Sequence, residues 1–263
     1  MNGVRKVLRD SGMVIWRNLL GVRRNPAMLT AATVQPVMFV LVLAYVFGDS
    51  LGGGPYREFL MAGIFTQTVT LNAAFTTIGM ANDLQKGIID RFRSLPMSRV
   101  AVILGRTGSD LLINVLGLAV MSICGLAIGW RINGGVVDAV AAYGLLLLFA
   151  FAMSWVGALV GLVSRSVEVA QSAGFLWMYP VTFISSAFIS LTNLPGPLRA
   201  FAEWNPITTV SDACRRLFGN PNLAPTAGWA AEHAAGYSVL ACVAIIAAFL
   251  PLAVSRYRWA AGR

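Results

Sequence analysis

The chain contains few residues that could hold a metal ion or carry out catalysis: it has one histidine and three cysteines among 263 residues. His233 has no second histidine with which to share a metal ion, and no Cys-x-x-Cys pair is present, so neither a metal site nor a disulfide framework is predicted. The phosphate-binding pattern GxxxxGKS/T is also missing, and the two lysines, Lys6 and Lys86, lie in other settings. We therefore expect no catalytic residue and no cofactor in this chain.

Charge is scarce as well, because 12% of the residues are charged whereas 57% are hydrophobic. The apolar residues gather in six long runs, and a helix of about 20 residues crosses a hydrocarbon core of roughly 30 Å. The sequence therefore predicts an all-α integral membrane protein with a single transmembrane domain over residues 1–263. The predicted spans are 28–47, 59–81, 108–129, 139–163, 172–191 and 234–255.

No charged residue lies deep inside a predicted span. Arg106 and Asp110 come closest, and their i, i+4 spacing at the mouth of the third span indicates an ion pair at the interface. Ion-coupled transporters usually place an ionisable group near the middle of the membrane, so this class is disfavoured. An intramembrane protease is disfavoured too, because His233 lies at the edge of the sixth span.

The basic residues are divided unevenly between the two sides of these spans. If the N-terminus is cytoplasmic, only Arg57, Arg131, Arg199, Arg215 and Arg216 face outward, and the other 15 of the 20 Lys and Arg residues face inward. The positive-inside rule then predicts that both termini are cytoplasmic. The net charge of +9 is explained by this topology, since the basic segments lie beside anionic lipid, and nucleic-acid binding is not expected.

Residues 1–27 are too charged to be read as a cleavable signal peptide. Within residues 4–22, apolar side chains share one side of a helical wheel and Arg and Lys occupy the other, with Trp16 at the boundary. This pattern is typical of an amphipathic helix that lies at the membrane surface, and an unstructured basic tail is the alternative. Asn25 and Pro26 are expected to end this helix before the first span begins.

Polar but uncharged side chains are frequent on the second predicted span. Thr66, Thr70 and Thr77 share one helical face. Two interpretations stay open: the face makes hydrogen bonds between helices, or it lines a substrate path to which Asn72 and Ser185 also belong.

Pairs of glycines four residues apart occur on the third and fourth spans. Gly125 with Gly129, and Gly157 with Gly161, have the spacing that lets two helix backbones approach closely. We predict contacts between helices at both pairs.

The longest inner loop, residues 82–105, mixes apolar and charged side chains. Its spacing predicts a short amphipathic helix that ends at Leu95 and Pro96. An exposed apolar face on such a loop needs a partner, which is lipid or protein.

Two segments resemble a known family. Residues 86–99 read KGIIDRFRSLPMSR and resemble the first cytoplasmic-loop motif of ABC type-2 permeases, in particular the daunorubicin-resistance (DrrB-like) branch. Residues 194–199 read LPGPLR and continue through WNPIT at 204–208 to Asp212 and Arg215, which resembles the segment after the fifth span in the same family. Both motifs fall in the expected topological places, so the resemblance covers nearly the whole chain.

The resemblance implies the membrane subunit of an ABC exporter, a multi-pass protein of the bacterial plasma membrane without enzymatic activity of its own. Two copies of a separate ATPase subunit would bind ATP and Mg²⁺, and the permease would pair with itself or with a second permease. The implied cargo is a lipophilic or amphipathic drug, antibiotic or lipid. A glycan or polyketide-type lipid is an alternative cargo, and a membrane protein that only binds partners is an alternative function.

The resemblance also assigns roles to particular residues. It implies a cytoplasmic coupling helix that contacts the ATPase, and short re-entrant helices between the fifth and sixth spans. The coupling residues would be Asp83, Gly87, Asp90, Arg91, Phe92, Arg93 and Pro96. The outer motif would comprise Pro195, Asn205, Pro206 and Thr208.

Overall fold

The computed structural model describes residues 9, 11–17, 20, 26–47, 54–87, 99–189, 191, 194–222 and 228–260. In this part of the chain all regular structure is helical and no strand occurs, which confirms the predicted all-α class. The elements are α2 (Pro26–Val42), a π-helical turn η1 (Leu43–Phe47), α4 (Gly54–Gln85), α6 (Arg99–Ala127), α7 (Val136–Val163), α8 (Val167–Phe183), α9 (Gly196–Trp204), α10 (Pro206–Phe218), α11 (Trp229–Glu232) and α12 (Ala234–Ala260).

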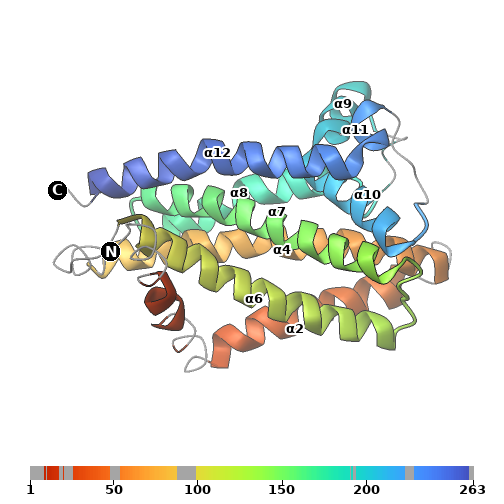
Figure 1. Cartoon of the computed structure of the whole chain (residues 1–263), viewed down its shortest axis with the longest axis horizontal. Coiled ribbons are helices and arrows are strands. Elements are labelled where there is room, and N and C mark those ends of the chain that lie inside the picture. Colours follow the sequence, from red (N-terminus) through yellow and green to blue (C-terminus); the bar gives the residue numbers. More distant parts are fainter. Residues whose placement is uncertain are drawn as a thin grey trace.

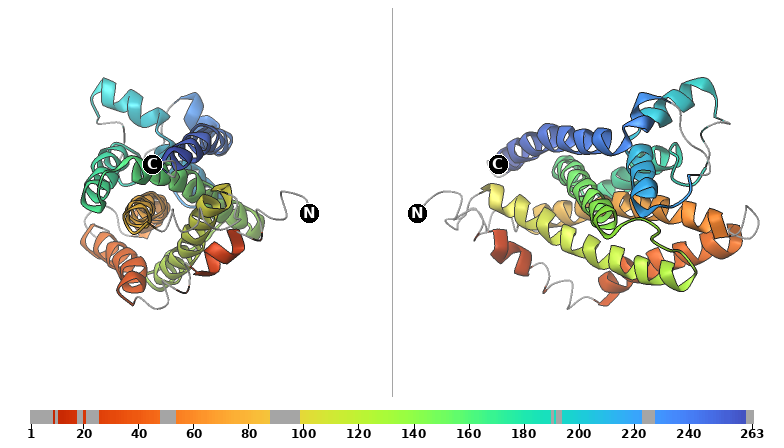
Figure 2. Two further views of the ribbon diagram at one scale, coloured as in Figure 1. Left: turned by 90° about the vertical axis from the view of Figure 1, so that its left-hand side faces the viewer. Right: turned by 45° about the vertical axis from the view of Figure 1, so that its right-hand side comes forward.

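Helix α4 lies at the centre of the bundle. It contacts α2, α6, α7, α8 and α10, whereas α12 packs on the far side of α7 and against α10 (Figures 1 and 2). The short helices α9, α10 and α11 gather at one end of the molecule, and α12 ends at the opposite end (Figure 1). The bundle therefore has two chemically distinct ends.

Four helices in the described part are long and apolar enough to cross a membrane: Gly54–Gln85, Ile103–Ala127, Val136–Val163 and Ala234–Tyr257. They correspond to the second, third, fourth and sixth predicted spans. The first predicted span contains the shorter apolar stretch Val34–Tyr45. Six crossings therefore remain a prediction.

The fifth predicted span, 172–191, differs from the observed helix α8, which begins at Val167 and ends at Phe183. The helix begins early because the Ser166 side chain accepts a hydrogen bond from the Val169 N–H and caps its first turn. With 17 residues, α8 is about 26 Å long, a little shorter than the roughly 30 Å hydrocarbon core.

Glycines bring α7 directly onto α4, as predicted for Gly157 and Gly161. A Cβ atom added to Gly157 would lie 2.3 Å from the carbonyl oxygen of Ala73, and one added to Gly161 would lie 2.5 Å from that of Thr77. Any larger residue would therefore push the two helices apart.

The other glycine pair does not act as a pair. A Cβ atom on Gly125 would lie 2.6 Å from the Met61 side chain of α4, so this contact is confirmed. Gly129 lies beyond the end of α6 in a turn, with φ +101° and no atom near its missing Cβ. The predicted helix contact at Gly129 is wrong, because the residue serves a turn that needs a positive φ.

The helical segment 11–17 packs beside α6 near the end of the bundle where α4 finishes (Figure 1). Val14 is buried, and a Cβ atom on Gly105 of α6 would lie 2.5 Å from the Val14 Cβ. Met13 and Trp16 are exposed. This division into a buried and an exposed side agrees with the predicted amphipathic helix, whose position at a membrane surface stays a prediction.

A cluster of aromatic rings closes the core near the other end. Phe65, Trp130, Tyr143 and Phe218 come from α4, the α6–α7 connection, α7 and α10, and the Trp130 and Phe218 ring centres lie 5.3 Å apart in an edge-to-face arrangement. The Trp130 indole N–H donates to Asn220 Oδ1 at 2.8 Å. The cluster fixes the end of α10 against the long helices.

Candidate functional site

The threonine face of α4 is turned into the protein. Thr66, Thr70 and Thr77 are completely buried. Each hydroxyl donates to the backbone carbonyl four residues earlier, at 2.9, 2.7 and 3.1 Å respectively. These hydroxyls bond within α4 and not to a neighbouring helix, so the bonds support neither the predicted hydrogen bonds between helices nor a role in cargo passage.

Ser185, which was also predicted to line the substrate path, lies in the turn after α8. Its hydroxyl donates to the Thr182 carbonyl and accepts from the Ala187 N–H at 3.3 Å. The side chain is buried and shapes the turn.

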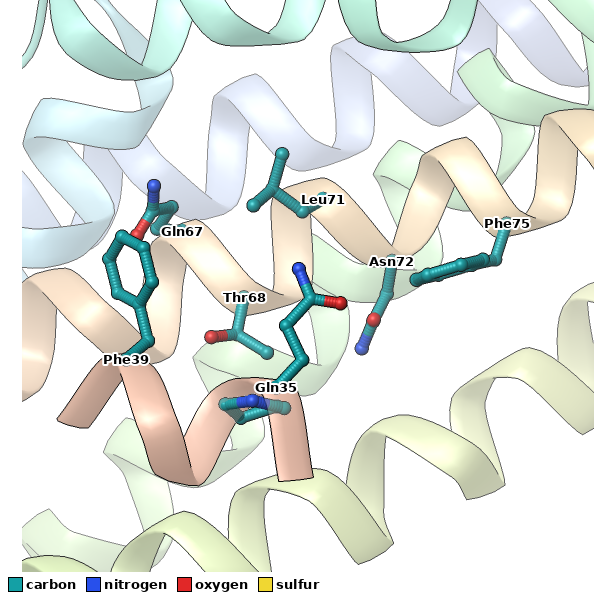
Figure 3. A pocket seen from close by; sticks show the side chains of 8 residues that line it. Gln35, Phe39, Gln67, Thr68, Leu71, Asn72 and Phe75 are labelled. Carbon is teal, nitrogen blue, oxygen red and sulfur yellow. The ribbon is translucent and has the colours of Figure 1, made fainter. Parts of the chain in front are cut away.

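A polar crevice opens instead between α2 and α4 (Figure 3). Figure 3 shows the Gln35 side chain reaching from α2 towards Thr68 and Asn72 of α4, with Phe39 beside Gln67. The cavity volume is about 20 Å³, enough for one water molecule. Uncharged amides and aromatic rings lie side by side in this crevice. The described residues that line it are Gln35, Pro36, Phe39, Gln67, Thr68, Leu71, Asn72 and Phe75.

Polar side chains continue from the crevice along the interface between α4 and α6. The Asn72 amide donates to Asn114 Oδ1 at 2.7 Å, and the Thr76 hydroxyl donates to Asp110 Oδ2 at 2.8 Å. The Asn114 amide in turn donates to the Asp110 carbonyl at 2.9 Å. The first two bonds join α4 to α6, and the third lies within α6 and positions the Asn114 amide.

Arg106 lies at the end of this row, between two carboxylates. Its guanidinium is 3.7 Å from Asp110 and 3.5 Å from Asp83 of α4, which confirms the predicted ion pair and adds a second acid. A Cβ atom on Gly79 would lie 1.6 Å from the guanidinium, so Arg106 occupies the space that this glycine leaves open. Asp83, predicted to contact the ATPase, thus pairs with Arg106 within the chain.

The predicted coupling segment begins directly where α4 ends. Gly87 has φ +63°, a conformation that favours glycine, and its N–H donates to the Leu84 carbonyl at 3.0 Å. The remaining coupling residues lie outside the described residues: Asp90, Arg91, Phe92, Arg93 and Pro96.

The outer motif forms the joint between α8 and α10. Pro195 precedes α9, and Asn205 caps α10, its Oδ1 accepting from the Ile207 N–H at 3.0 Å ahead of Pro206. The Asn205 amide donates to two carbonyls at the end of α8, those of Val181 and Ile184, at 2.7 and 2.9 Å. One asparagine therefore ends one helix and begins another.

Thr208 extends this joint by one turn. Its hydroxyl oxygen accepts from the Ser186 N–H at 3.1 Å, and the Ser186 hydroxyl donates to Asp212 Oδ1 at 3.0 Å. Ten of the 13 residues of α10 are buried, so the predicted outer segment enters the bundle at this helix. Whether it enters the membrane stays a prediction.

Arg215 is the centre of this network and was foreseen only as one of the outward basic residues and as part of the motif. It is completely buried. Its Nε donates to the Phe59 carbonyl at 3.0 Å, its Nη1 to Asp212 Oδ1 at 2.7 Å, and its Nη2 to the carbonyls of Ser186 and Ala187 at 2.8 and 3.0 Å. The i, i+3 spacing of Asp212 and Arg215 is the only sequence signal that could have indicated this pair.

The neighbouring Cys214, which lies between the fifth and sixth predicted spans, is buried as well. Its thiol faces the Ala142 carbonyl of α7 at 3.8 Å. Among the described residues no group of acids, histidines and cysteines could hold a metal ion.

These observations define a class: a polytopic helical membrane protein whose long helices α4 and α6 are joined by uncharged polar contacts and by the Arg106–Asp83 pair, with a further ion pair, Asp212–Arg215, buried in α10. The sequence matches the model of the ABC-2 type transporter family over residues 11–218, more than half of the chain, and the chain belongs to this family. The resemblance inferred from the two motifs is thereby confirmed.

Two relatives extend this assignment. The chain is 29% identical over 246 residues to the daunorubicin resistance ABC transporter permease protein DrrB1 of Streptomyces coeruleorubidus, covering 93% of this chain and 84% of that protein. It is 23% identical over 232 residues to the putative transport permease ycf38 of Pyropia yezoensis, covering 82% of this chain and 76% of that protein. The chain is therefore similar to membrane permeases of ABC transporters, a family that implies pairing with an ABC ATPase.

Proposed function

We propose that this chain is the permease subunit of an ATP-driven exporter in the bacterial plasma membrane, and that its cargo is a lipophilic or amphipathic drug, antibiotic or lipid. The similarity to a daunorubicin resistance permease over 93% of the chain carries this proposal.

The crevice between α2 and α4 supports this cargo class. The amides of Gln35, Gln67 and Asn72 and the rings of Phe39 and Phe75 offer hydrogen bonds and apolar contact without a formal charge. Such a lining suits an amphiphile better than an inorganic ion. Because the cavity holds about one water molecule, a cargo molecule enters only when α2 and α4 separate.

Energy would come from two copies of a separate ATPase subunit, which hold ATP and Mg²⁺. The coupling helix around Gly87–Pro96 would sit in a groove of the ATPase, which pushes on it when the nucleotide-bound dimer closes. Gly87, the first residue of this predicted helix, follows directly on α4, and the Arg106–Asp83 pair ties the same end of α4 to α6. A push would therefore move both helices, and a homodimer or heterodimer of permeases would reorient together.

The test is reconstitution in liposomes with an ABC ATPase subunit that co-purifies with the chain, using daunorubicin as the cargo probe. Phe92→Ala removes an apolar anchor of the kind that costs about 2 kcal/mol at an interface, and Asp90→Arg reverses a charge. Both variants should insert and assemble normally yet lose ATP-driven efflux. Phe201→Ala removes an exposed aromatic ring from α9 and should transport normally.

Each readout separates the alternatives. Normal coupled efflux in both loop variants would exclude this loop as the coupling site. ATPase binding without daunorubicin movement in the unmodified protein would favour a glycan or polyketide-type lipid as cargo. Failure of any ABC ATPase to bind would favour a membrane protein that only binds partners.

A further inference from the structure

A second cavity lies at the end of the bundle opposite α9 and α10. It has a volume of about 560 Å³, within the range of roughly 300–1,000 Å³ that is typical of small-molecule pockets. It forms where α4 ends, where α7 turns into α8, and where α12 ends. Its lining is Ala81, Leu84, Gln85, Leu162, Val163, Ser164, Arg165, Ser166 and Arg256.

The charge in this lining is of one sign. Arg165 comes from the turn between α7 and α8, and Arg256 comes from the last turns of α12, so the two cations reach the cavity from segments far apart in the sequence. No carboxylate is among the lining residues that the structure describes, and Glu168, the nearest acid along the chain from Arg165, is not one of them. Two guanidinium groups at one cavity favour a ligand that carries an oxyanion, and phosphate matches the fork of N–H donors.

The rest of the lining is mostly apolar. Ala81 and Leu84 of α4 and Leu162 and Val163 of α7 supply apolar side chains, and Gln85, Ser164 and Ser166 supply amide and hydroxyl groups. A free inorganic anion makes no favourable contact with apolar side chains, whereas a lipid presents a phosphate beside its glycerol and acyl chains. The cavity also lies at the end predicted to be cytoplasmic, where the membrane leaflet holds anionic lipid and basic pockets between helices bind lipid head groups.

We propose that this cavity binds the phosphate head group of an anionic phospholipid from the inner leaflet, at a site separate from the crevice between α2 and α4. The bound lipid bridges Arg165 and Arg256 and thereby joins the α7–α8 turn to the end of α12. The inference depends on the topology predicted from the basic residues and not on the nature of the exported cargo.

Native mass spectrometry of the purified, delipidated full chain tests the site. The protein is titrated with phosphatidylglycerol, with phosphatidylcholine and with glycerol phosphate as the free anion. We expect a preference for phosphatidylglycerol over phosphatidylcholine, which weakens at least about tenfold in the Arg165→Gln/Arg256→Gln double variant, because this variant loses the charge-assisted hydrogen bonds to the phosphate. Arg165→Lys/Arg256→Lys retains both charges and should keep most of the preference.

Arg131→Gln is the matched control, because it removes one exposed arginine at the other end of the bundle and should leave lipid binding unchanged. Gel filtration and the melting temperature show that each variant is folded. An unchanged phosphatidylglycerol preference in the double Gln variant would overturn the proposal. Equal binding of glycerol phosphate would also overturn it, because a free anion would then be the ligand. Loss of ATPase docking in the double Gln variant, with lipid binding intact, would overturn it too and would assign the arginines to the protein partner.

Discussion

At the scale of single residues, Arg215 shows how this protein holds a charge in its interior. The guanidinium stands 3.8 Å over the Phe59 ring and pairs with Asp212, while backbone carbonyls of two other segments accept its remaining N–H groups. Burying an ion pair costs much solvation free energy, and it is tolerated only when every donor and acceptor is satisfied. Arg215 therefore joins α10, the start of α4 and the turn after α8 at one point.

Removing the cation alone should be costly. Arg215→Met leaves the Asp212 carboxylate buried without its partner, and breaking such a pair typically costs about 3–5 kcal/mol. The double variant Arg215→Met/Asp212→Leu removes both charges and should recover much of that loss. Thermal unfolding of the purified protein in detergent measures both.

Arg216→Met is the control, because this neighbouring arginine is exposed and, within the described part of the chain, its side chain donates to the Glu232 carbonyl at 3.1 Å. Equal melting temperatures for Arg215→Met and Arg216→Met would show that the buried pair does not stabilise the fold.

A second prediction at this scale concerns the contact of α7 with α4. Gly157→Ala places a methyl group 2.3 Å from the Ala73 carbonyl oxygen and should destabilise the protein by about 1–3 kcal/mol through overpacking. Gly144→Ala on the same helix has no atom within 4 Å of the new methyl group, and it should be neutral or slightly stabilising. Comparable melting temperatures for the two variants would contradict the close contact.

At the scale of elements, α4 presents different polar groups to different neighbours. Thr70 turns into the protein and bonds within its own helix, Thr68 faces the crevice beside α2, and Asn72 and Thr76 bond to α6. A helix with polar groups on several sides cannot be assigned a single functional face from its sequence. The surrounding helices decide which groups can be reached by a cargo molecule.

Two threonines on this helix provide a matched pair for the cargo path. Thr68→Val removes a hydroxyl from the crevice. If the crevice binds the cargo, the apparent affinity for daunorubicin should fall roughly fivefold, because the lost polar contact contributes about 1 kcal/mol. Thr70→Val removes a hydroxyl that bonds within α4 and should leave the apparent affinity unchanged. Drug efflux from proteoliposomes measures both, and a change for Thr70→Val alone would favour the path along Thr66, Thr70 and Thr77.

At the scale of the whole molecule, the two ends of the bundle carry different structures. One end holds the buried joint of α8 with α10 and the aromatic cluster around Trp130. The other end holds the helical segment 11–17, the end of α4 and the cavity with Arg165 and Arg256. The predicted cytoplasmic end and the predicted outer end are thus separated by the length of the long helices.

Cysteine labelling tests which end is cytoplasmic. In a variant without native cysteines, Val137→Cys should react with a membrane-impermeant maleimide in intact cells, because this residue is 81% exposed at the end of α7 that is predicted to face outward. Glu168→Cys, exposed at the other end, should react only after permeabilisation. The unmodified protein should not be labelled at Cys214, which is buried. Reaction of Glu168→Cys in sealed cells would reverse the topology.

The sequence by itself determined the helical membrane class, the places of the four long helices and the family. Length and lack of charge are enough to indicate a helix that can cross a membrane, since an unpaired backbone is not tolerated in lipid. The contact of Gly157 and Gly161 was also predictable, because only a missing side chain allows such an approach. The two motifs identified the family because their residues lie in a fixed topological order.

Only the tertiary structure decided which side of each helix is buried. Lipid and protein interior are both apolar, so hydrophobic periodicity does not separate a face towards lipid from a face towards a neighbouring helix. For this reason the sequence could not tell that Thr70 points inward, that Thr68 faces a crevice or that Gly129 serves a turn. Arg215 was equally hidden, because its solvation is replaced by carbonyl groups from residues 59, 186 and 187, which only folding brings together.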